Sequence, residues 1–333
     1  MVRVNRLLCA AVLVAALPLV GCGPLPGQGE SEGKPVKLGF SAWPGWFPWQ
    51  VAQEKGFFKR NGLDVDLRWY DNYTDSLTAL TNGDIDANSQ TLNDTLSSVT
   101  DGARETIVLV NDNSTGNDQI IARPGINKIA DLKGKKVAAE EGTVDHYLLM
   151  LALRKAGLGP KDVQFQPMAT DAAADALNQG KVDAVGVFAP FTTTALQLEG
   201  SKAIATSKDF PGAIPDHLVV TGAFLNKRPD DVQSLVKTWF DTVDWIEANR
   251  QEANRIMAKR AGVSESEYSS YEAGTTIFSL EQNVQAFRTG TNAVSLPFQA
   301  RSLSQFLFDN RLAPMKPALN GLFEPRFILA LRD

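Results

Sequence analysis

Cysteine and histidine are scarce in this chain, which has two of each among its 333 residues. Neither His146 nor His217 stands in a zinc-binding spacing, and neither an H-E-x-x-H nor a G-x-x-x-x-G-K-[ST] motif is present. The adjacent acids Glu140 and Glu141 are weak evidence for acid–base catalysis, because no partner for them can be placed. The sequence therefore predicts a protein that holds no metal and no cofactor and is not an enzyme.

Basic residues are in the minority, with 33 Lys and Arg against 38 Asp and Glu and a net charge of −5. A protein that binds nucleic acid needs a basic face to neutralise phosphates. No segment of the chain offers one, so nucleic acid is excluded as a partner.

Long apolar runs are also lacking, apart from residues 7–20, which fall short of the ~20 residues of a membrane-spanning helix. Arg3 and Arg6 precede this run and Leu-Val-Gly-Cys at 19–22 closes it, which is the pattern of a lipoprotein signal peptide. We expect residues 1–21 to be removed, Cys22 to be acylated, and the protein to lie in the periplasm or on the outer face of the cell membrane. An ordinary secretory signal with an incidental Cys22 is the alternative.

Processing at Cys22 would leave no cysteine for a disulfide, because Cys9 departs with the signal peptide. It would also remove Arg3 and Arg6, so that the net charge becomes 31 − 38 = −7. Residues 22–35 are rich in Gly and Pro and are expected to form a flexible linker. The folded part is expected to begin near Val36.

An internal repeat organises the rest of the chain. ALTNGDIDA at 79–87 is echoed by ALNQGKVDA at 176–184, which places Leu177 and Leu80 97 positions apart (177 − 80). Each copy is typical of a helix end, a glycine stop and a strand. The motif alone could be a common helix-to-strand connection in two unrelated halves. However, a predicted strand, helix and second strand precede both copies in the same order. The pattern predicts an α/β fold of two lobes, each a mainly parallel sheet flanked by helices.

The chain after residue 224 is predicted to be largely helical, with one helix opening at Pro229 and another over 302–310. The predicted strands are residues 37–40, 63–70, 107–110, 136–139, 163–166 and 182–187.

Aromatic residues gather after the first predicted strand, where ligands of open α/β sheets bind. Four of the six tryptophans lie between positions 43 and 69. We expect Trp43 and Trp46 to form the walls of a box for a flat or cationic ligand, and Trp49 to point into the core. A plug of core side chains is the alternative.

Two other predicted strands lead into polar segments. Residues 111–118 are dense in Asn, Asp and short side chains, which also serve turns by bonding to their own backbone. In residues 140–146, Thr143 is expected to cap a helix, and a helix N-terminus favours anions. Glu140 and Glu141 would repel an anion and suit a cation or a hydrogen-bond donor, unless both face water.

These features resemble the substrate-binding proteins of the nitrate, sulfonate, taurine and thiamine-precursor type, which feed ATP-binding-cassette importers. The resemblance is carried by the lipobox at Cys22, GFFKRNGLDV at 56–65, DLKGKKV at 131–137 and the two repeats. It implies a clamshell of type II whose chain crosses between lobes near 120–125 and 217–223. Lobe 1 would comprise 36–122 with 222–333, and lobe 2 would comprise 123–221. The resemblance also implies a monomer that delivers its solute to permease subunits, which work with a cytoplasmic ATPase.

The usual ligands of that family are small anions or flat heterocycles, and anion-binding members tend to have small residues where this chain has Glu140 and Glu141. We therefore predict a guanidinium-like or amine cation, which gains ~2 kcal/mol between ring faces and needs a carboxylate partner. A small anion (nitrate, a sulfonate, taurine or bicarbonate) or a thiamine pyrimidine precursor is the alternative. A ligand sensor and a same-fold enzyme are the alternative classes.

We expect the ligand to stack on aromatic rings, to form hydrogen bonds with neutral side chains and to pair with carboxylates. Residues of the second lobe are expected to form the opposite wall of the site. The predicted site residues are Trp43, Trp46, Gln90, Asn93, Asp112, Ser114, Glu141, Thr143, His146, Phe188 and Asp216.

Overall fold

The computed structural model describes residues 33–332 of the chain. The predicted signal peptide, the lipidation site at Cys22 and most of the predicted linker lie outside these described residues. Within residues 33–332, no helix is both long enough and apolar enough to cross a membrane.

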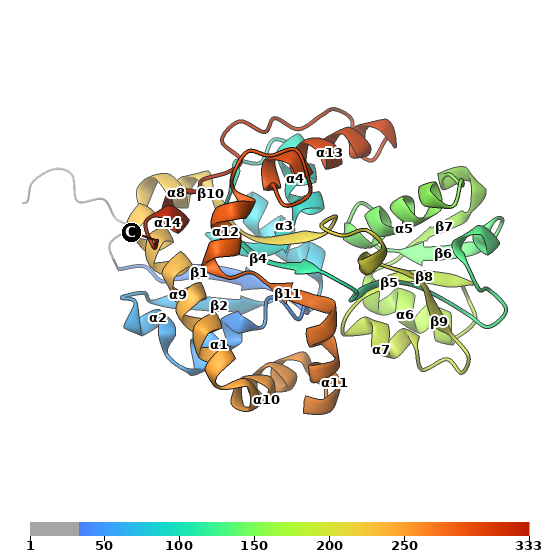
Figure 1. The fold of residues 1–333 in the computed structure, drawn as a ribbon, viewed down its shortest axis with the longest axis horizontal. Helices are drawn as coiled ribbons and strands as arrows, with labels where there is room; N and C mark the ends of the chain where they lie inside the picture. The colour runs from blue at the N-terminus through green and yellow to red at the C-terminus, as the bar shows by residue number, and fades with distance from the viewer. Residues whose placement is uncertain (1–32, 333) are drawn as a thin grey trace, which may run out of the picture. The chain divides into compact units, whose positions relative to one another are not determined.

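Two β-sheets flanked by helices make up the fold (Figure 1). The first sheet has six strands in the order β11, β4, β10, β3, β1, β2. Their bounds are Thr275–Ile277, Glu105–Ser114, Pro215–Thr221, Ala87–Thr91, Val36–Phe40 and Val65–Trp69. The second sheet has five strands in the order β7, β6, β8, β5, β9. Their bounds are Gln164–Pro167, Lys136–Ala139, Ala184–Phe188, Asp118–Ala122 and Lys202–Thr206.

Both sheets are mixed. In the first, β1 runs parallel to β2 and β3, whereas β10 runs antiparallel to β3 and β4. In the second, β6 runs parallel to β7 and β8, whereas β5 runs antiparallel to β8 and β9. The two-lobed α/β fold is confirmed, and the expectation of mainly parallel sheets is replaced by this half-parallel pattern.

The repeat in the sequence corresponds to a repeat in the structure. Gly83 follows α3 (Tyr73–Asn82) and leads to β3, and Gly180 follows α6 (Thr170–Asn178) and leads to β8. Gly83 and Gly180 have φ of 76° and 68°, a left-handed conformation that glycine adopts without steric cost.

Other helices cover the sheets and continue the chain to its end. They are α1 (Pro48–Glu54), α2 (Phe57–Arg60), α4 (Leu92–Thr100), α5 (Val144–Lys155), α7 (Phe191–Ala195), α8 (Gly222–Lys227), α9 (Pro229–Ala248), α10 (Arg250–Ala261), α11 (Glu265–Tyr271), α12 (Leu280–Ala286), α13 (Leu296–Asp309) and α14 (Arg326–Leu329).

Helix α9 packs on α1 and α2 and brings Trp239 into the core of the first sheet's layer. Trp49 meets Trp239 with ring centroids 4.7 Å apart and donates from Nε1 to Ser89 Oγ at 2.8 Å. Both rings are fully buried. Trp49 therefore points into the core, as its sequence position indicated.

The chain passes between the sheets twice, and sheet membership differs from the predicted lobe boundaries by one strand each time. Strand β4 continues to Ser114 because β11, a segment far along the chain, pairs with its polar end. The second sheet begins at Asp118, and the first sheet resumes at Pro215. We therefore propose that the lobes exchange at residues 115–117 and 207–214. The two passages are joined by a 2.7 Å hydrogen bond between Ser114 Oγ and Ser207 Oγ.

Candidate functional site

A small cavity lies where side chains of the two sheets meet. From the first sheet's side come the β1–α1 segment, the start of α3, the end of β3 and the start of β10. From the second come the first residue of β5, the first residue of α5 and the end of β8. The lining residues are Trp43, Trp46, Tyr73, Thr91, Asp118, Val144, Phe188, Ile214 and Asp216.

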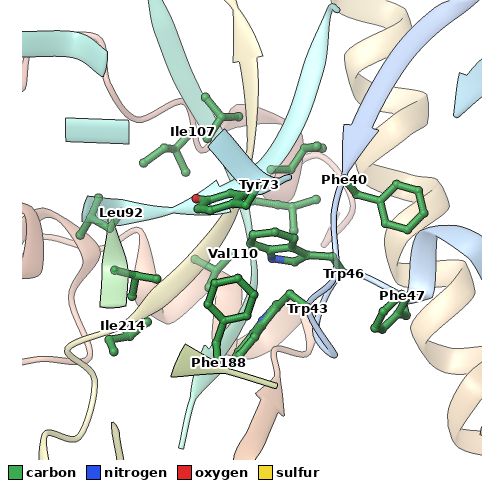
Figure 2. Packing of buried hydrophobic residues seen from close by; sticks show 14 of the residues in the cluster. Phe40, Trp43, Trp46, Phe47, Tyr73, Leu92, Ile107, Val110, Phe188 and Ile214 are labelled. Carbon is green, nitrogen blue, oxygen red and sulfur yellow. The ribbon is translucent and has the colours of Figure 1, made fainter. Parts of the chain in front are cut away.

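Four aromatic rings enclose this cavity (Figure 2). Trp43 has its ring centroid 6.4 Å from that of Trp46 and 6.2 Å from that of Phe188. The ring centroid of Tyr73 lies 5.3 Å from that of Trp46 and 6.4 Å from that of Phe188, so Tyr73 contacts the ring group on its remaining side. Figure 2 shows these four rings grouped together, with Phe47 apart from them. The structure thus brings Trp43, Trp46 and Phe188 into one aromatic box with Tyr73.

The segment between β1 and α1 carries two of these rings and is fixed at both sides. Trp43 donates from Nε1 to Asp112 Oδ1 at 2.9 Å, and Tyr268 donates its hydroxyl to the Pro44 carbonyl at 2.9 Å. Gly45 passes so close that a Cβ added to it would lie 2.0 Å from Asp112 Oδ2. A glycine at this position is what allows the loop to press against the carboxyl group.

Three buried aspartates stand together beside the rings. Asp112 and Asp216 are directly opposite each other on β4 and β10, and Asp118 is the first residue of β5. They are 0 %, 1 % and 1 % exposed for Asp112, Asp118 and Asp216 respectively. Among the described residues, no amide, hydroxyl or basic group donates to Asp112 Oδ2, Asp118 Oδ2 or either carboxyl oxygen of Asp216. The carboxyl groups of Asp112 and Asp216 are close enough to share a proton in a hydrogen bond with each other. Among the described residues that line the cavity, none is Lys or Arg.

Burial dominates the electrostatics of these groups because it disfavours the charged form. It raises the pKa of Asp118 to about 7. It also raises the pKa of Asp112 and of Asp216, and the negative charge of Asp112 raises the pKa of Asp216 further. An ionised carboxylate here would lack a positive partner, and such a group costs several kcal/mol.

A fourth aspartate, Asp94 at the start of α4, is fully hydrogen-bonded by contrast. Tyr73 and Thr91 donate their hydroxyls to its Oδ2 at 2.7 Å each, and Asn93 donates Nδ2 to its Oδ1 at 3.0 Å. Burial raises the pKa of Asp94 to about 6, and these bonds hold it below that of Asp118. Asn93 Nδ2 also donates to the Gly142 carbonyl at 2.9 Å, a direct bond from the first sheet's side to the second's.

A pair of acids on the second sheet's side is joined by Thr170. Its hydroxyl lies 2.9 Å from Glu140 Oε2 and 2.9 Å from Asp145 Oδ2. Burial raises the pKa of both carboxyl groups, and that of Asp145 more strongly. The surroundings of the cavity are therefore acidic on both sides.

Comparison with known proteins places the chain in a family. Residues 29–262 match the NMT1-like family. The chain belongs to the NMT1-like family.

Two relatives carry descriptive names. The NMT1-like chain is 28 % identical over 280 residues to a protein of Brucella abortus named as a binding protein, covering 80 % of this chain and 84 % of that one. It is 25 % identical over 244 residues to the taurine-binding periplasmic protein of Escherichia coli, covering 71 % and 76 %.

A solved structure of the same fold is the alkanesulfonate-binding protein SsuA of Xanthomonas axonopodis pv. citri bound to MOPS. The TM-score is 0.74 at 18 % identity, over 87 % of this chain and 98 % of that one. This likeness shows that the NMT1-like chain has the fold of a periplasmic binding protein.

Two sequence-predicted site residues of the NMT1-like chain point away from the cavity along β3 and α5. Gln90 donates to Glu105 Oε2 at 3.1 Å and to Thr95 Oγ1 at 3.0 Å, because its neighbour Thr91 takes the cavity face of the strand. His146 stacks on Phe165 with ring centroids 4.3 Å apart. Neither residue lines the cavity.

Three further predicted residues serve neighbouring contacts. Glu141 is exposed, and Glu140 occupies the buried position beside it. Thr143 precedes α5 as predicted, yet its hydroxyl donates to the Glu140 carbonyl at 2.9 Å and does not cap the helix. Ser114, the last residue of β4, bonds Ser207 and does not line the cavity.

The prediction missed Tyr73, Thr91, Asp118, Val144 and Ile214, which all line the cavity. Tyr73 follows the tryptophan-rich segment 43–69, and Asp118 is the last residue of the acceptor-rich segment 111–118. Each is the first residue of a helix or strand. Val144 and Ile214 are ordinary apolar residues, and no sequence signal separates them from core positions.

Proposed function

We propose that this NMT1-like protein is the extracytoplasmic solute-binding protein of an ATP-binding-cassette importer, and that its ligand is a small nitrogen-containing cation, guanidinium-like or an amine. The observation that carries the proposal is the pair Asp118 and Asp216, which line the cavity at 1 % exposure without a basic neighbour in its lining. A cation supplies the missing counter-charge.

Energetics favour a cation over an anion in this cavity. A buried carboxylate without a partner costs several kcal/mol, which a bound cation offsets. The ring faces of Trp43 and Trp46 add about 2 kcal/mol once water is excluded. An anion would meet Asp118 and Asp216 as like charges or would require both to stay protonated.

The importer role is supported by the family and by the names of the relatives. In a two-sheet binding protein, ligand contacts from both sides favour a closed form, which a permease can distinguish from the open one. Asp216 and Asp118 come from different sheets, so one ligand can contact both. The lipid anchor at Cys22, the monomeric state and the permease with its cytoplasmic ATPase belong to the same proposal.

A second candidate is a small anion, which the taurine-binding and alkanesulfonate-binding names favour for those proteins. The Trp46 Nε1 group, a buried donor without a partner among the described residues, is the group that could serve it. Taurine itself carries both an ammonium and a sulfonate group.

Isothermal titration calorimetry on soluble protein that begins after Cys22 tests the proposal. The panel is guanidinium, small amines, a thiamine pyrimidine, nitrate, bicarbonate, taurine and an alkanesulfonate. Binding of guanidinium or an amine at micromolar or lower Kd, about −8 kcal/mol, with weaker binding of every anion, is the expected result. Binding of anions alone would overturn the proposal of a cationic ligand and leave the importer role standing.

The neighbouring genes test the alternative class. A sensor-kinase gene beside the gene for this protein, without permease genes, would favour a ligand sensor over an importer component.

A further inference from the structure

We infer that the ligand of this site is a compact planar cation whose charge is spread over several N–H groups, an amidinium or a guanidinium, and that quaternary ammonium compounds are rejected. This inference rests on the proposed function, since it names the class of cation.

Unpartnered acceptors give the first argument. Asp118 and Asp216 line the cavity, and Asp118 Oδ2 and both oxygens of Asp216 receive no hydrogen bond from an amide, hydroxyl or basic group within residues 33–332. The polar neighbour of Asp216 is the carboxyl group of Asp112, with which it can share a proton. A buried acceptor without a donor keeps its full desolvation cost. A quaternary ammonium has no N–H group and could donate no hydrogen bond to Asp118 or Asp216, although an aromatic box alone would suit it.

Placement of the carboxyl groups gives the second argument. Asp112 and Asp216 lie on paired strands of the first sheet, whereas Asp118 opens β5 of the second. The ligand must therefore donate in more than one direction. An alkylammonium has up to three N–H donors on a single nitrogen, whereas guanidinium groups present donors around a plane in a geometry that matches carboxylates.

The rings give the third argument, which concerns size and shape. Trp43 and Tyr73 each meet Phe188 nearly at right angles, with interplanar angles of 82° and 86°. Rings that contact each other edge to face close the sides of the cavity, so it admits only a ligand of few atoms. A flat cation can lie against one ring face while its edges reach Asp118 and Asp216.

A calorimetric comparison of three chloride salts at pH 8 tests this inference. Guanidinium is expected to bind at least about tenfold tighter than methylammonium, a difference of about 1.4 kcal/mol, and tetramethylammonium is expected not to bind. Tetramethylammonium binding as tightly as guanidinium would overturn the inference and leave the cation proposal standing. Binding of anions alone in the wider solute panel described above would overturn both the inference and the cation proposal. Absence of binding by all three salts would also overturn the inference.

Substitutions of buried acids show which carboxyl groups bind guanidinium. Asp216→Asn and Asp118→Asn each remove a charge that lines the cavity, and each is expected to weaken guanidinium binding by roughly 30-fold or more. Glu105→Gln is the control, because Glu105 is buried with a pKa raised to about 7 by that burial yet bonds Thr81 and Gln90 outside the cavity lining. It is expected to keep the wild-type affinity. Thermal unfolding of each variant confirms that it is folded, and equal affinity loss in Glu105→Gln would contradict the assignment.

Discussion

Asp112 and Asp216 face each other directly across the antiparallel strands β4 and β10, with no basic residue in the lining of the cavity beside them. Directly opposed side chains on neighbouring strands point to the same face of a sheet. Two carboxyl groups in this arrangement cannot both ionise easily, and burial adds to the cost. Burial therefore raises the pKa of both residues, and a protonated member of the pair can donate a hydrogen bond to the other.

Cation affinity should rise with pH through the neutral range. The pKa of Asp118 is raised to about 7 by burial, so below pH 7 a ligand must displace a proton from it. Affinity is expected to fall roughly tenfold per pH unit below 7 for each proton displaced. Calorimetry from pH 5.5 to 8.5, in buffers of different ionisation enthalpy, measures both the affinity and the protons released. A pH-independent affinity without proton release would contradict a carboxylate site.

The ligand-free protein should lose stability as the pH rises. Between the unfolded pKa of Asp118, about 4, and its folded value of about 7, the native state holds a proton that the unfolded state has released. Its stabilising contribution is thus complete below pH 4 and is lost as the pH rises to 7, at up to about 1.4 kcal/mol per pH unit. Urea unfolding at pH 5 and pH 8 measures the change.

Asp118→Asn provides the reference for that experiment, because it lacks the titrating group. The burial that lowers the pKa of His217 to about 3 acts in the opposite direction below pH 6.5, and it cancels when wild type and variant are compared. The wild type should lose about 2 to 3 kcal/mol more than Asp118→Asn between pH 5 and pH 8. Equal losses would show that Asp118 is not buried as described.

Trp43→Phe should weaken ligand binding and shift its pH profile. The substitution keeps a ring but removes the Nε1 donor to Asp112 Oδ1, a bond that lowers the pKa of Asp112. A hydrogen bond to a charged group is worth about 1.5 to 3 kcal/mol, so a loss of roughly tenfold or more is expected, with the midpoint of binding at higher pH. Trp49→Phe, which removes a donor to neutral Ser89, should lower stability and leave the pH midpoint unchanged.

Gly45→Ala should displace the carboxyl group of Asp112, which faces Asp216 across the sheet. The added Cβ would lie 2.0 Å from Asp112 Oδ2, so the carboxyl group must move. Forcing a side chain off its rotamer costs about 0.5 to 1.5 kcal/mol, which predicts up to about a tenfold loss of guanidinium affinity by calorimetry. Gly222→Ala is the control, since its Cβ would meet Arg104 at an ordinary 3.5 Å. Wild-type affinity in Gly45→Ala would contradict the close contact.

Local signals sufficed for much of the fold. Gly83 and Gly180 mark repeated helix stops, and Pro229 opens α9 where the sequence places it. The strand extension to Ser114 could not be predicted, because it depends on pairing with β11 more than 150 residues away. Asn and Asp favour turns in isolation, and here tertiary pairing prevails over that preference.

The aromatic half of the site was accessible from sequence, because Trp43 and Trp46 stand together after a strand. The acidic half was accessible in part. The sequence points to Asp112 and Asp216 but does not distinguish Asp118 from a turn residue, because it stands in an Asn- and Asp-rich segment. Glu141 was preferred over Glu140 because adjacent residues cannot be assigned a face without the helix that follows them.

The most direct test of the central claim compares three planar, trigonal solutes of similar size and different charge: guanidinium, urea and nitrate. Calorimetry at pH 8 on the protein that begins after Cys22 measures how affinity depends on the charge of the solute, because the three solutes have nearly the same shape. The acidic aromatic site predicts tight binding of guanidinium, weak binding of urea and no binding of nitrate. Nitrate binding more tightly than guanidinium would contradict the account.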